Sequence, residues 1–480
     1  MDLPGYLVTF GAVALALTYV LAIPSALEAI LKARTAQGSI AWVISLLAIP
    51  PIAVPAYLVF GRSRFDGYLE ERDTVEAQAT RLIDQTSDFI EKHLVKTDSD
   101  TPLYTSLFRL ARMPATSGNH VTLLIDGTQT FTSIALGLRR ARQFILFQFY
   151  IVRDDDLGNR LGKILIDKAR EGVDVFFLYD EIGSSGFHNT ALHKALCTAG
   201  VKVTSFNTTQ GRRNRFQLNF RNHRKVVVVD GKEAWVGGHN VGNEYLGFES
   251  PMAPWRDTHV SIRGPAVLGA MLAFATDWHW ATRTNLNLQI HSMPTSDGAS
   301  NVLVFPSDPA SEYEEAGLMY HQVIFAARKR IWIASPYFVP DNAIMSALQL
   351  AALRGVDVRV IIPERTDAVL VGLANWSFVS QLLPFGIKIY RYLPGFMHQK
   401  VFLLDDEIAG VGTANFDNRS FRLNFEITLL IEDRAFASEV ESMLEQDMTQ
   451  CRQVSEQEIK NKSIWFTLAT SAARLLAPVL

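Results

Sequence analysis

The first sixty residues form the most apolar part of the chain. Residues 3–27 and 39–61 contain no Asp, Glu, Lys or Arg, and each segment exceeds the roughly 20 residues that an α-helix needs to cross a bilayer. We therefore predict two transmembrane helices within residues 1–65. The second contains Pro50, Pro51 and Pro55, and proline removes helix hydrogen bonds, so we expect this span to be kinked or partly re-entrant.

Residues 66–118 change to a charged pattern with apolar residues at helical intervals. This spacing predicts an amphipathic connecting helix over residues 66–97. The apolar residues on which this prediction depends are Leu82, Ile83, Phe89, Ile90 and Leu94.

From about His120 onwards, strand-like and helix-like segments alternate, and the order occurs twice. ARQFILFQFYIVRDDD (141–156) matches ARKRIWIASPYFVPDN (327–342), and EGVDVFFLYDE (171–181) matches RGVDVRVIIPE (354–364). Such self-similarity indicates an internal duplication, and βα alternation indicates an α/β fold. We predict one domain over residues 119–290 and a second over 300–455, separated by the Ser- and Pro-containing stretch 291–300.

The tail, residues 456–480, ends in the apolar stretch IWFTLATSAARLLAPVL with one Arg. Two placements fit a segment of this kind, a helix packed on the preceding domain or a helix lying on a membrane surface. We favour packing and keep both open.

Composition narrows the class of protein. The chain has 480 residues, 48% of them hydrophobic, which suffices for two or three packed domains. Its net charge of -3 lacks the positive excess of proteins that grip nucleic acid through phosphates. The two cysteines form neither a disulfide framework nor a zinc-ligand spacing.

Each half of the duplication carries the same set of polar residues around an apolar strand. The segments are NHRKVVVVDGKEAWVGGHN (222–240) and MHQKVFLLDDEIAGVGTAN (397–415). One short motif of this type is expected by chance in roughly a few per cent of chains of this composition, but two copies at identical spacing inside a repeated unit are not. The residues shared at equal spacing are His223, Lys225, Asp230 and Asn240 in the first copy, and His398, Lys400, Asp405 and Asn415 in the second.

The paired motif suits transfer of a phosphoryl ester. His and Lys two residues apart on a strand point to the same face. If the two strands meet, one imidazole can attack phosphorus and form a phosphohistidine while the other protonates the departing alcohol and later activates the acceptor. The lysines would neutralise the non-bridging oxygens, and the asparagines would add N–H donors. This chemistry needs no metal and no cofactor.

A carboxylate is expected to hold each imidazole in one tautomer. Asp230 and Asp405 are the candidates, and the sequence leaves open whether each serves its own motif or the opposite one. His239 lies beside Asn240 but faces away from it on a strand, so we expect a packing position for it.

The sequence resembles the phospholipase D superfamily, whose mark is this paired His-Lys-Asp motif, and within it the bacterial cardiolipin synthases. The likeness extends over nearly the whole chain, including the two apolar N-terminal segments. Its more specific blocks are RDDDLG (153–158), VGGHNVGNEYLG (236–247), PWRDTHVSIRGPAV (254–267) and GTANFDNRSFRLNFE (412–426).

The resemblance implies two α/β/α sandwich domains, related by a pseudo-twofold axis and sharing one active site. It further implies transfer of a phosphatidyl group between two phosphatidylglycerol molecules, giving cardiolipin and glycerol. By this resemblance His223 is the nucleophile and His398 the general acid and base. Thr413 matches the hydroxyl residue after the glycine of the second motif, where the first motif has Gly238.

The resemblance also implies substrate-binding positions and a location. Glu426 matches the acidic residue that follows the second motif, and Glu244 takes a comparable place after the first. Within the block 254–267, Trp255, Arg256, Asp257 and His259 resemble a site block, but Trp255 and Asp257 fit equally well a role in holding the loop against the core, and we do not expect these residues to act directly in catalysis. The expected location is the bacterial inner membrane, with several spans and cytoplasmic catalytic domains.

Three other functions remain as alternatives. A phospholipase D that hydrolyses head groups would share every catalytic residue, and a nuclease of the superfamily is disfavoured by the apolar segments and the negative charge. A membrane scaffold without catalysis is disfavoured by the intact His and Lys in both copies. The sequence does not define head-group or acyl selectivity, oligomeric state or, from its charges, membrane orientation.

Overall fold

The computed structural model describes residues 3–33, 35–61, 65, 68, 86–95, 102–207, 219–248, 251–286 and 288–477. The chain forms two compact units. Residues 1–71 make up the first, together with the short segments 207–220 and 309–312, and the remainder makes up the second.

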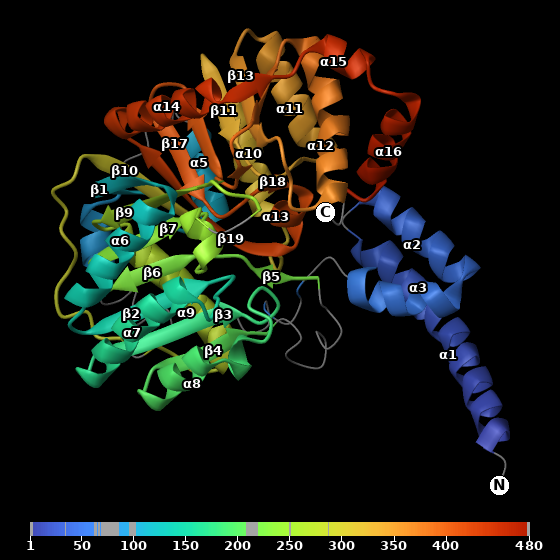
Figure 1. The fold of residues 1–480 in the computed structure, drawn as a ribbon, viewed down its shortest axis with the longest axis horizontal. Helices are drawn as coiled ribbons and strands as arrows, with labels where there is room; N and C mark the ends of the chain where they lie inside the picture. Colours follow the sequence, from blue (N-terminus) through green and yellow to red (C-terminus); the bar gives the residue numbers. More distant parts are fainter. Residues whose placement is uncertain are drawn as a thin grey trace. The chain divides into compact units, whose positions relative to one another are not determined.

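The first unit is helical. It contains α1 (Leu3–Lys32), α2 (Ala36–Ala48), α3 (Pro50–Ala56) and the π-helix η1 (Tyr57–Gly61) (Figure 1). Within the described residues, α1 alone is long and apolar enough to cross a membrane, over the 24 residues Thr9–Lys32. The first of the two predicted spans therefore exists as one continuous apolar helix.

The second predicted span is divided. The backbone at Ile49 leaves the helical region (φ -139°, ψ 63°), and the chain restarts at Pro50 and Pro51. The 13 residues of α2 rise only about 20 Å at 1.5 Å per residue, short of a bilayer core of about 30 Å. The second predicted span is therefore not one continuous helix, and the prolines that predict a kink lie at the break.

Small side chains let the helices of the first unit approach one another. Ala22, Ala26 and Ala29 lie four and then three residues apart on one face of α1, and they are buried in one cluster with Leu46 and Tyr57. Close packing through small residues is typical of helices in membranes.

The predicted connecting helix is described only in part. Residues 86–92 are helical, whereas Leu82 and Ile83 lie outside the described residues. A second helix follows in this stretch, α5 (Pro102–Ala111). Its residues Leu103, Leu107 and Ala111 share one face and are buried in the core of the second unit.

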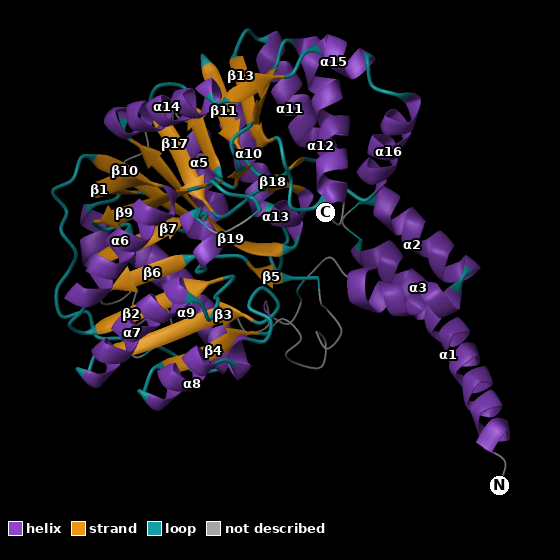
Figure 2. Cartoon of the chain, in the orientation of Figure 1, coloured by secondary structure: helices purple, strands orange, loops and turns teal. Residues whose placement is uncertain are grey.

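One 16-stranded mixed sheet runs through the second unit (Figure 2). Read outwards from the antiparallel pair β1–β10, one side has the order β1-β9-β7-β6-β2-β3-β4 and the other β10-β19-β17-β16-β11-β13-β14-β20. The first side comprises β1 (Thr116–Ile125), β2 (Phe144–Phe149), β3 (Asp174–Asp180), β4 (Lys202–Phe206), β6 (Val226–Val229), β7 (Glu233–Gly237) and β9 (Thr258–Arg263). The second side comprises β10 (Ser300–Ser307), β11 (Arg330–Ala334), β13 (Asp357–Pro363), β14 (Lys388–Tyr392), β16 (Val401–Leu404), β17 (Ile408–Gly412), β19 (Asn424–Glu432) and β20 (Cys451–Gln453). The sixteenth strand, β5 (Arg221–Asn222), lies outside this order and pairs with β19.

The matching strand orders confirm the internal duplication and the α/β fold. The predicted α/β/α sandwich domains are not separate in the structure. The strands β1 and β10 pair with each other and join the two halves into one sheet within one compact unit.

Helices cover both faces of the sheet. On the first side, one face is covered by α6 (Asp126–Arg140), α7 (Asp156–Arg170) and α8 (Ala191–Thr198), and the other face by α9 (Val267–Thr282) (Figure 1). On the second side, one face is covered by α10 (Glu315–Ala326), α11 (Asn342–Leu353) and α12 (Val369–Leu382), and the other face by α14 (Arg434–Thr449). The four valines of β6 are all buried because alternate side chains enter opposite layers, with Val227 and Val229 facing α6 and α7. The remaining short elements are β12 (Phe338–Val339), β18 (Phe416–Asp417), α13 (Asn418–Arg422), η2 (Phe187–Asn189), η3 (Asn243–Leu246) and η4 (Leu383–Phe385).

Candidate active site

Two short strand pairs bring the two motifs to each other's half of the sheet. β5 (Arg221–Asn222) runs parallel to the start of β19, and β15 (Phe396–Met397) runs parallel to β8 (Trp255–Arg256). The backbone N–H of His223 donates to the carbonyl of Phe425 (2.9 Å) and that of His398 to the carbonyl of Arg256 (2.7 Å). Each motif histidine is therefore held by backbone from the opposite half.

The ring of His223 is anchored by a buried carboxylate. Its Nδ1 lies 2.9 Å from Oε2 of Glu426, a residue of the opposite half. Glu426 also accepts hydrogen bonds from three polar side chains, the Thr413 hydroxyl (2.6 Å), the Ser420 hydroxyl (2.9 Å) and the Asn424 amide (3.0 Å). Burial alone would raise the pKa of Glu426, but His223, Lys225 and the Thr413 hydroxyl hold it below its usual value.

The ring of His398 has the equivalent partner. Its Nδ1 lies 2.7 Å from Oδ2 of Asp257, while Oδ1 of Asp257 accepts from the backbone N–H of Thr258 (2.8 Å). Asp257 follows β8 as Glu426 follows the paired start of β19, so the two carboxylates occupy matching positions. Burial opposes ionisation of Asp257, yet the neighbouring His239, Lys400 and His398 hold its pKa well below the usual range.

These contacts define the tautomers. A carboxylate at Nδ1 requires that Nδ1 carries the proton, so the neutral ring of each histidine presents an unprotonated Nε2. Burial, with the cations Lys225 and Lys400 nearby, lowers the pKa of His223 to about 4 and that of His398 to about 3. Both imidazoles are therefore neutral at pH 7 when no anionic ligand is present.

The motif lysines lie in the same buried environment. Nζ of Lys225 donates to the carbonyl of His223 (2.7 Å), and Nζ of Lys400 donates to the carbonyl of His398. Burial lowers the pKa of Lys225 to about 7; the charge of Lys400 adds to this effect and Glu426 opposes it. Burial also lowers the pKa of Lys400 to about 8. Each lysine also lowers the pKa of the histidine in the other motif. The four side chains are thus within electrostatic reach of one another.

Aromatic rings enclose the two histidines. Tyr150 meets the ring of His223 edge-on at 5.0 Å between centroids. Around His398 stand Trp255 at 5.1 Å, Phe396 at 5.7 Å and Tyr245 at 6.5 Å. Such walls keep water away from a reacting phosphorus and strengthen electrostatic contacts within the site.

Asp230 and Asp405 do not orient the histidines, so that hypothesis is wrong. Asp230 ends β6, and its carboxylate accepts from the backbone N–H groups of residues 142, 143 and 144 at 2.8–3.0 Å. Asp405 ends β16 and accepts in the same way from residues 328, 329 and 330. Both have positive φ (53° and 51°), which Asp tolerates better than most residues. Each aspartate ties the end of its motif strand to the start of the next strand in the sheet.

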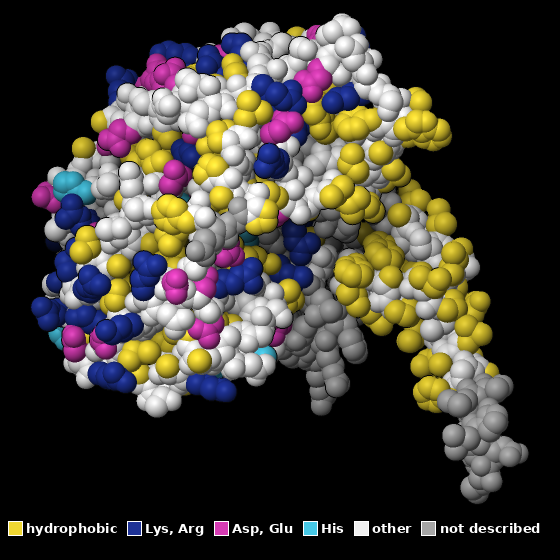
Figure 3. All heavy atoms as spheres, viewed as in Figure 1, with side chains coloured by type: hydrophobic (Ala, Val, Ile, Leu, Met, Phe, Trp, Pro, Cys, Tyr) yellow, Lys and Arg dark blue, Asp and Glu magenta, His cyan; other side chains and the backbone are white. Residues whose placement is uncertain are grey.

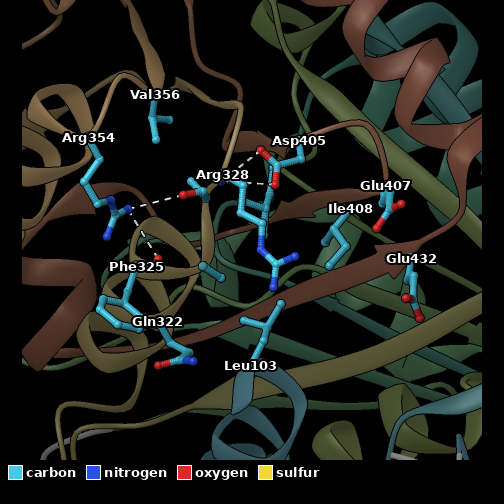
Figure 4. A pocket seen from close by; sticks show the side chains of 13 residues that line it. Leu103, Gln322, Phe325, Arg328, Arg354, Val356, Asp405, Glu407, Ile408 and Glu432 are labelled. Carbon is cyan, nitrogen blue, oxygen red and sulfur yellow. Dashed lines mark hydrogen bonds between the residues drawn. The ribbon is translucent and has the colours of Figure 1, made fainter. Parts of the chain in front are cut away.

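Figure 4 shows Asp405 beside a cavity of about 750 Å³ lined by Leu103, Phe325, Arg328, Arg354 and Glu432, among others. This cavity opens at the end of β16 that is remote from Lys400, because Lys400 immediately precedes the strand and Asp405 immediately follows it. It is therefore separate from the histidine site.

The other predicted binding residues divide into two groups. Thr413 lies in the site, and Asn415 has a buried Oδ1 without a partner in the described part of the chain. Asn240 is engaged elsewhere, since it accepts from the N–H of Ile151 (3.1 Å) and donates to the Tyr245 hydroxyl (3.1 Å). Glu244 pairs with Arg153 (3.0 Å) and does not take the place opposite Glu426.

Gly238 replaces the hydroxyl residue for a steric reason. A Cβ at Gly238 would lie 2.0 Å from Oδ1 of Asp257. In the other half Thr413 fits and donates to the longer Glu426. The first half therefore combines glycine with aspartate where the second combines threonine with glutamate.

Behind Asp257 lie two further buried histidines, His239 and His259, whose Nδ1 atoms are 3.2 Å apart. Burial lowers the pKa of His239 to about 4 and that of His259 well below its usual value. Among the described residues, no group of three or more His, Cys, Asp or Glu side chains is arranged to hold a metal ion.

Comparisons with known proteins identify the family. Residues 134–250 and 320–448 match the family described as "Cardiolipin synthase, PLD-like domain". The chain belongs to this family. It is 45% identical to cardiolipin synthase A of Pseudomonas fluorescens over 471 residues, which cover 97% of this chain and 98% of that one. It is 46% identical to cardiolipin synthase A of Pseudomonas aeruginosa over 464 residues, covering 96% and 94%.

A solved structure supports the fold. Phosphatidylserine synthase of Haemophilus influenzae superposes with a TM-score of 0.60, covering 79% of this chain and all of that one at 16% identity. At this identity the likeness concerns the arrangement of the two halves alone.

The important site residue that sequence reasoning missed is Asp257. It stands in the family block 254–267 but was assigned there to packing. A usable signal was present, because Asp257 immediately precedes β9 and Glu426 is the third residue of β19, and these two strands hold equivalent positions in the two halves of the sheet.

Proposed function

We propose that the protein is a cardiolipin synthase that transfers a phosphatidyl group from one phosphatidylglycerol to another and releases glycerol. The observation that carries the proposal is the pairing of His223 with Glu426 and of His398 with Asp257, each across the two halves, with both motif lysines in the same buried space.

In the first step Nε2 of His223 bonds to phosphorus as the bond from phosphorus to the glycerol oxygen breaks. Protonated His398 donates its proton to that oxygen, so glycerol leaves neutral. The bound phosphodiester adds a negative charge that favours the imidazolium of His398, and Asp257 stabilises it from behind. Lys225 and Lys400 balance the charge on the non-bridging oxygens. The Asn415 amide donates a further hydrogen bond to these oxygens.

In the second step neutral His398 takes the proton of a terminal hydroxyl on the second phosphatidylglycerol. The resulting oxygen bonds to phosphorus, and the bond from phosphorus to His223 breaks, which restores the enzyme. Thr413 and Glu426 hold His223 in the tautomer required for both steps. The chemistry uses side chains of this chain only.

The membrane supplies both substrates. In this proposal α1 spans the inner membrane, the segment of residues 36–61 enters it as a second, broken span, and the catalytic unit faces the cytoplasm. The length and composition of α1 and the apolar character of α2 and α3 support this arrangement.

The test is product analysis by mass spectrometry with the purified full chain in phosphatidylglycerol vesicles. We expect cardiolipin and glycerol from the unaltered chain and neither from His223→Ala or His398→Ala. His188→Ala is a matched control, because His188 is exposed outside the site, and it should keep full activity. Phosphatidic acid without cardiolipin would instead identify a hydrolase, and full activity in either site variant would contradict the assignment.

A further inference from the structure

The C-terminal helix packs on the catalytic unit by only one of its faces. After α15 (Glu456–Lys460), α16 (Ile464–Leu475) lies beside α12 (Figure 1). The ring of Phe466 meets that of Trp376 at 5.9 Å, and Thr470 and Ala473 are buried. These three residues of α16 follow one another at four and three positions, the spacing of a single helical face.

The opposite face of α16 is also apolar, but it is exposed. Ile464, Leu468 and Leu475 recur at four and seven positions, and Trp465 lies beside them. Trp465 is 77% exposed, Leu475 79% and Leu468 52%. A helix that only docks on a domain needs one apolar stripe and carries polar residues on its other side. The second stripe therefore requires an apolar environment outside the catalytic unit.

The start of α12, which packs beside α16, carries further exposed apolar side chains. Val369 is 77% exposed and Leu370 47%. Two residues before Val369, Asp367 accepts a hydrogen bond from the Tyr337 hydroxyl (2.6 Å). The carbonyl of Tyr337 accepts from the Ser335 hydroxyl, which itself accepts from the N–H of Phe416, next to Asn415 of the second motif.

We call the combined area the α16 surface, and it comprises Val369, Leu370, Ile464, Trp465, Leu468 and Leu475. Figure 3 shows hydrophobic side chains gathered over α16. The helix itself contains no Asp or Glu, and the basic residues Arg365, Lys462 and Arg474 lie close to the surface residues in sequence; Lys462 also pairs with Glu458 (3.7 Å).

We propose that the α16 surface lies in the boundary between the head groups and acyl chains of an anionic lipid bilayer. The combination of an exposed tryptophan, aliphatic side chains and neighbouring basic residues is what such a boundary binds. The chain also carries the apolar helix α1, and this inference rests on the proposed function, in which α1 lies in the inner membrane. The contact would present the motif-two side of the active site to the lipid in which its substrates reside.

The test places an environment-sensitive nitrobenzoxadiazole label on the surface of the full-length protein. Cys197 and Cys451 are replaced by serine, Leu468→Cys is labelled, and the protein is reconstituted into vesicles of phosphatidylcholine and phosphatidylglycerol. We expect a blue-shifted emission that is quenched by lipid-attached nitroxides near the head groups and protected from aqueous iodide. The matched control is a second protein that keeps Leu468 and Cys197, has Cys451 replaced by serine, and carries the label on Cys197. Cys197 is exposed on α8, so this label should be quenched by iodide. Neither readout depends on turnover.

Two outcomes would overturn the proposal. Iodide quenching at position 468 equal to that at Cys197 would show that the surface remains in water. Protection from iodide without quenching by the lipid nitroxides would show that protein covers it, either a second copy or the N-terminal part of the same chain.

A second measurement asks whether the contact matters for access to substrate. The combined variant Trp465→Ser, Leu468→Ser and Leu475→Ser changes exposed side chains only. We expect at least about a tenfold loss of phosphatidyl transfer on vesicles, because each apolar side chain removed from lipid weakens the contact. Activity on substrate dispersed in detergent should be unchanged, and an equal loss in both would contradict a role in docking.

Discussion

Replacing Asp257 by Asn isolates the contribution of the carboxylate behind His398. The substitution keeps size and shape. Oδ1 can still accept from the N–H of Thr258, as it does in the native protein at 2.8 Å. The amide nitrogen then faces Nδ1 of His398 in place of Oδ2, and because it donates, Nδ1 must become an acceptor. The neutral ring would therefore carry its proton on Nε2, which is the wrong tautomer for a base.

The expected loss follows from the geometry. The Nδ1–Oδ2 contact of 2.7 Å joins a carboxylate to a ring that must become positively charged in each half-reaction. A hydrogen bond to a charged group contributes about 1.5–3 kcal/mol, and a charge pair about 4 Å apart contributes about 4 kcal/mol at an effective dielectric constant of 20. A loss of about 3–4 kcal/mol corresponds to a reduction in kcat of about a hundredfold to a thousandfold, at 1.36 kcal/mol per tenfold.

The assay is the steady-state formation of cardiolipin from phosphatidylglycerol, normalised to folded protein measured by thermal unfolding. Asp230→Asn is the matched control, because the sequence predicts Asp230 as an orienting carboxylate, whereas its carboxylate accepts from the backbone N–H groups of residues 142–144. If Asp257→Asn keeps kcat within a few-fold of the unaltered protein, or if Asp230→Asn lowers kcat as much, the assignment of the orienting carboxylate is refuted.

The remaining predictions concern the same site. Gly238→Ala should reduce kcat about as strongly as Asp257→Asn, because its Cβ would lie 2.0 Å from Oδ1 of Asp257; unchanged kcat would show that the aspartate can shift without consequence. Asp230→Asn should lower the free energy of unfolding by about 1–3 kcal/mol, measured by denaturant titration, through its unsatisfied backbone N–H group. The value of kcat/KM should fall as pH rises through about 7–8, because Lys225 and Lys400 have pKa values lowered to about 7 and about 8 and lose their charge there; a profile flat to pH 9.5 would contradict this. Activity should persist in a chelator such as EDTA, and a loss reversed only by added metal would contradict the metal-free chemistry.

The sequence predicts the duplicated fold and the reactive side chains well because their signals are local. The spacing of His223, Lys225 and Asp230 on one apolar strand, repeated 175 positions later, requires no knowledge of tertiary contacts. The four buried valines between two layers of helices follow from the same pattern.

The partners of the histidines were not predictable in this way. His223 and Glu426 are 203 positions apart, and His398 and Asp257 are 141 positions apart. They meet only because β5 pairs with β19 and β15 with β8, and nothing in the composition of the two-residue strands β5, β8 and β15 indicates that pairing. An aspartate next to the motif strand was the simpler hypothesis, and it failed because the strand end needs its own cap.

Glu244 illustrates a related difficulty. Glu244 follows Asn240 in sequence, so we expect it to be the counterpart of Glu426 in the first motif. It lies instead on a short 3₁₀ turn and pairs with Arg153 near the surface. The longer connection before Asp257 placed the true counterpart of Glu426 farther along the chain than a comparison of the motifs alone suggested.

The central claim is that His223 and His398 act on one phosphorus, with His223 forming the covalent bond. The most direct test incubates the His398→Ala variant with a phosphatidyl ester of p-nitrophenol, whose leaving group needs no acid, and maps the adduct by peptide mass spectrometry. The account predicts one equivalent of released nitrophenol and a phosphatidyl group on His223. An adduct on another residue, or release of nitrophenol in this variant at the same rate as in the His223→Ala, His398→Ala double variant, would contradict it.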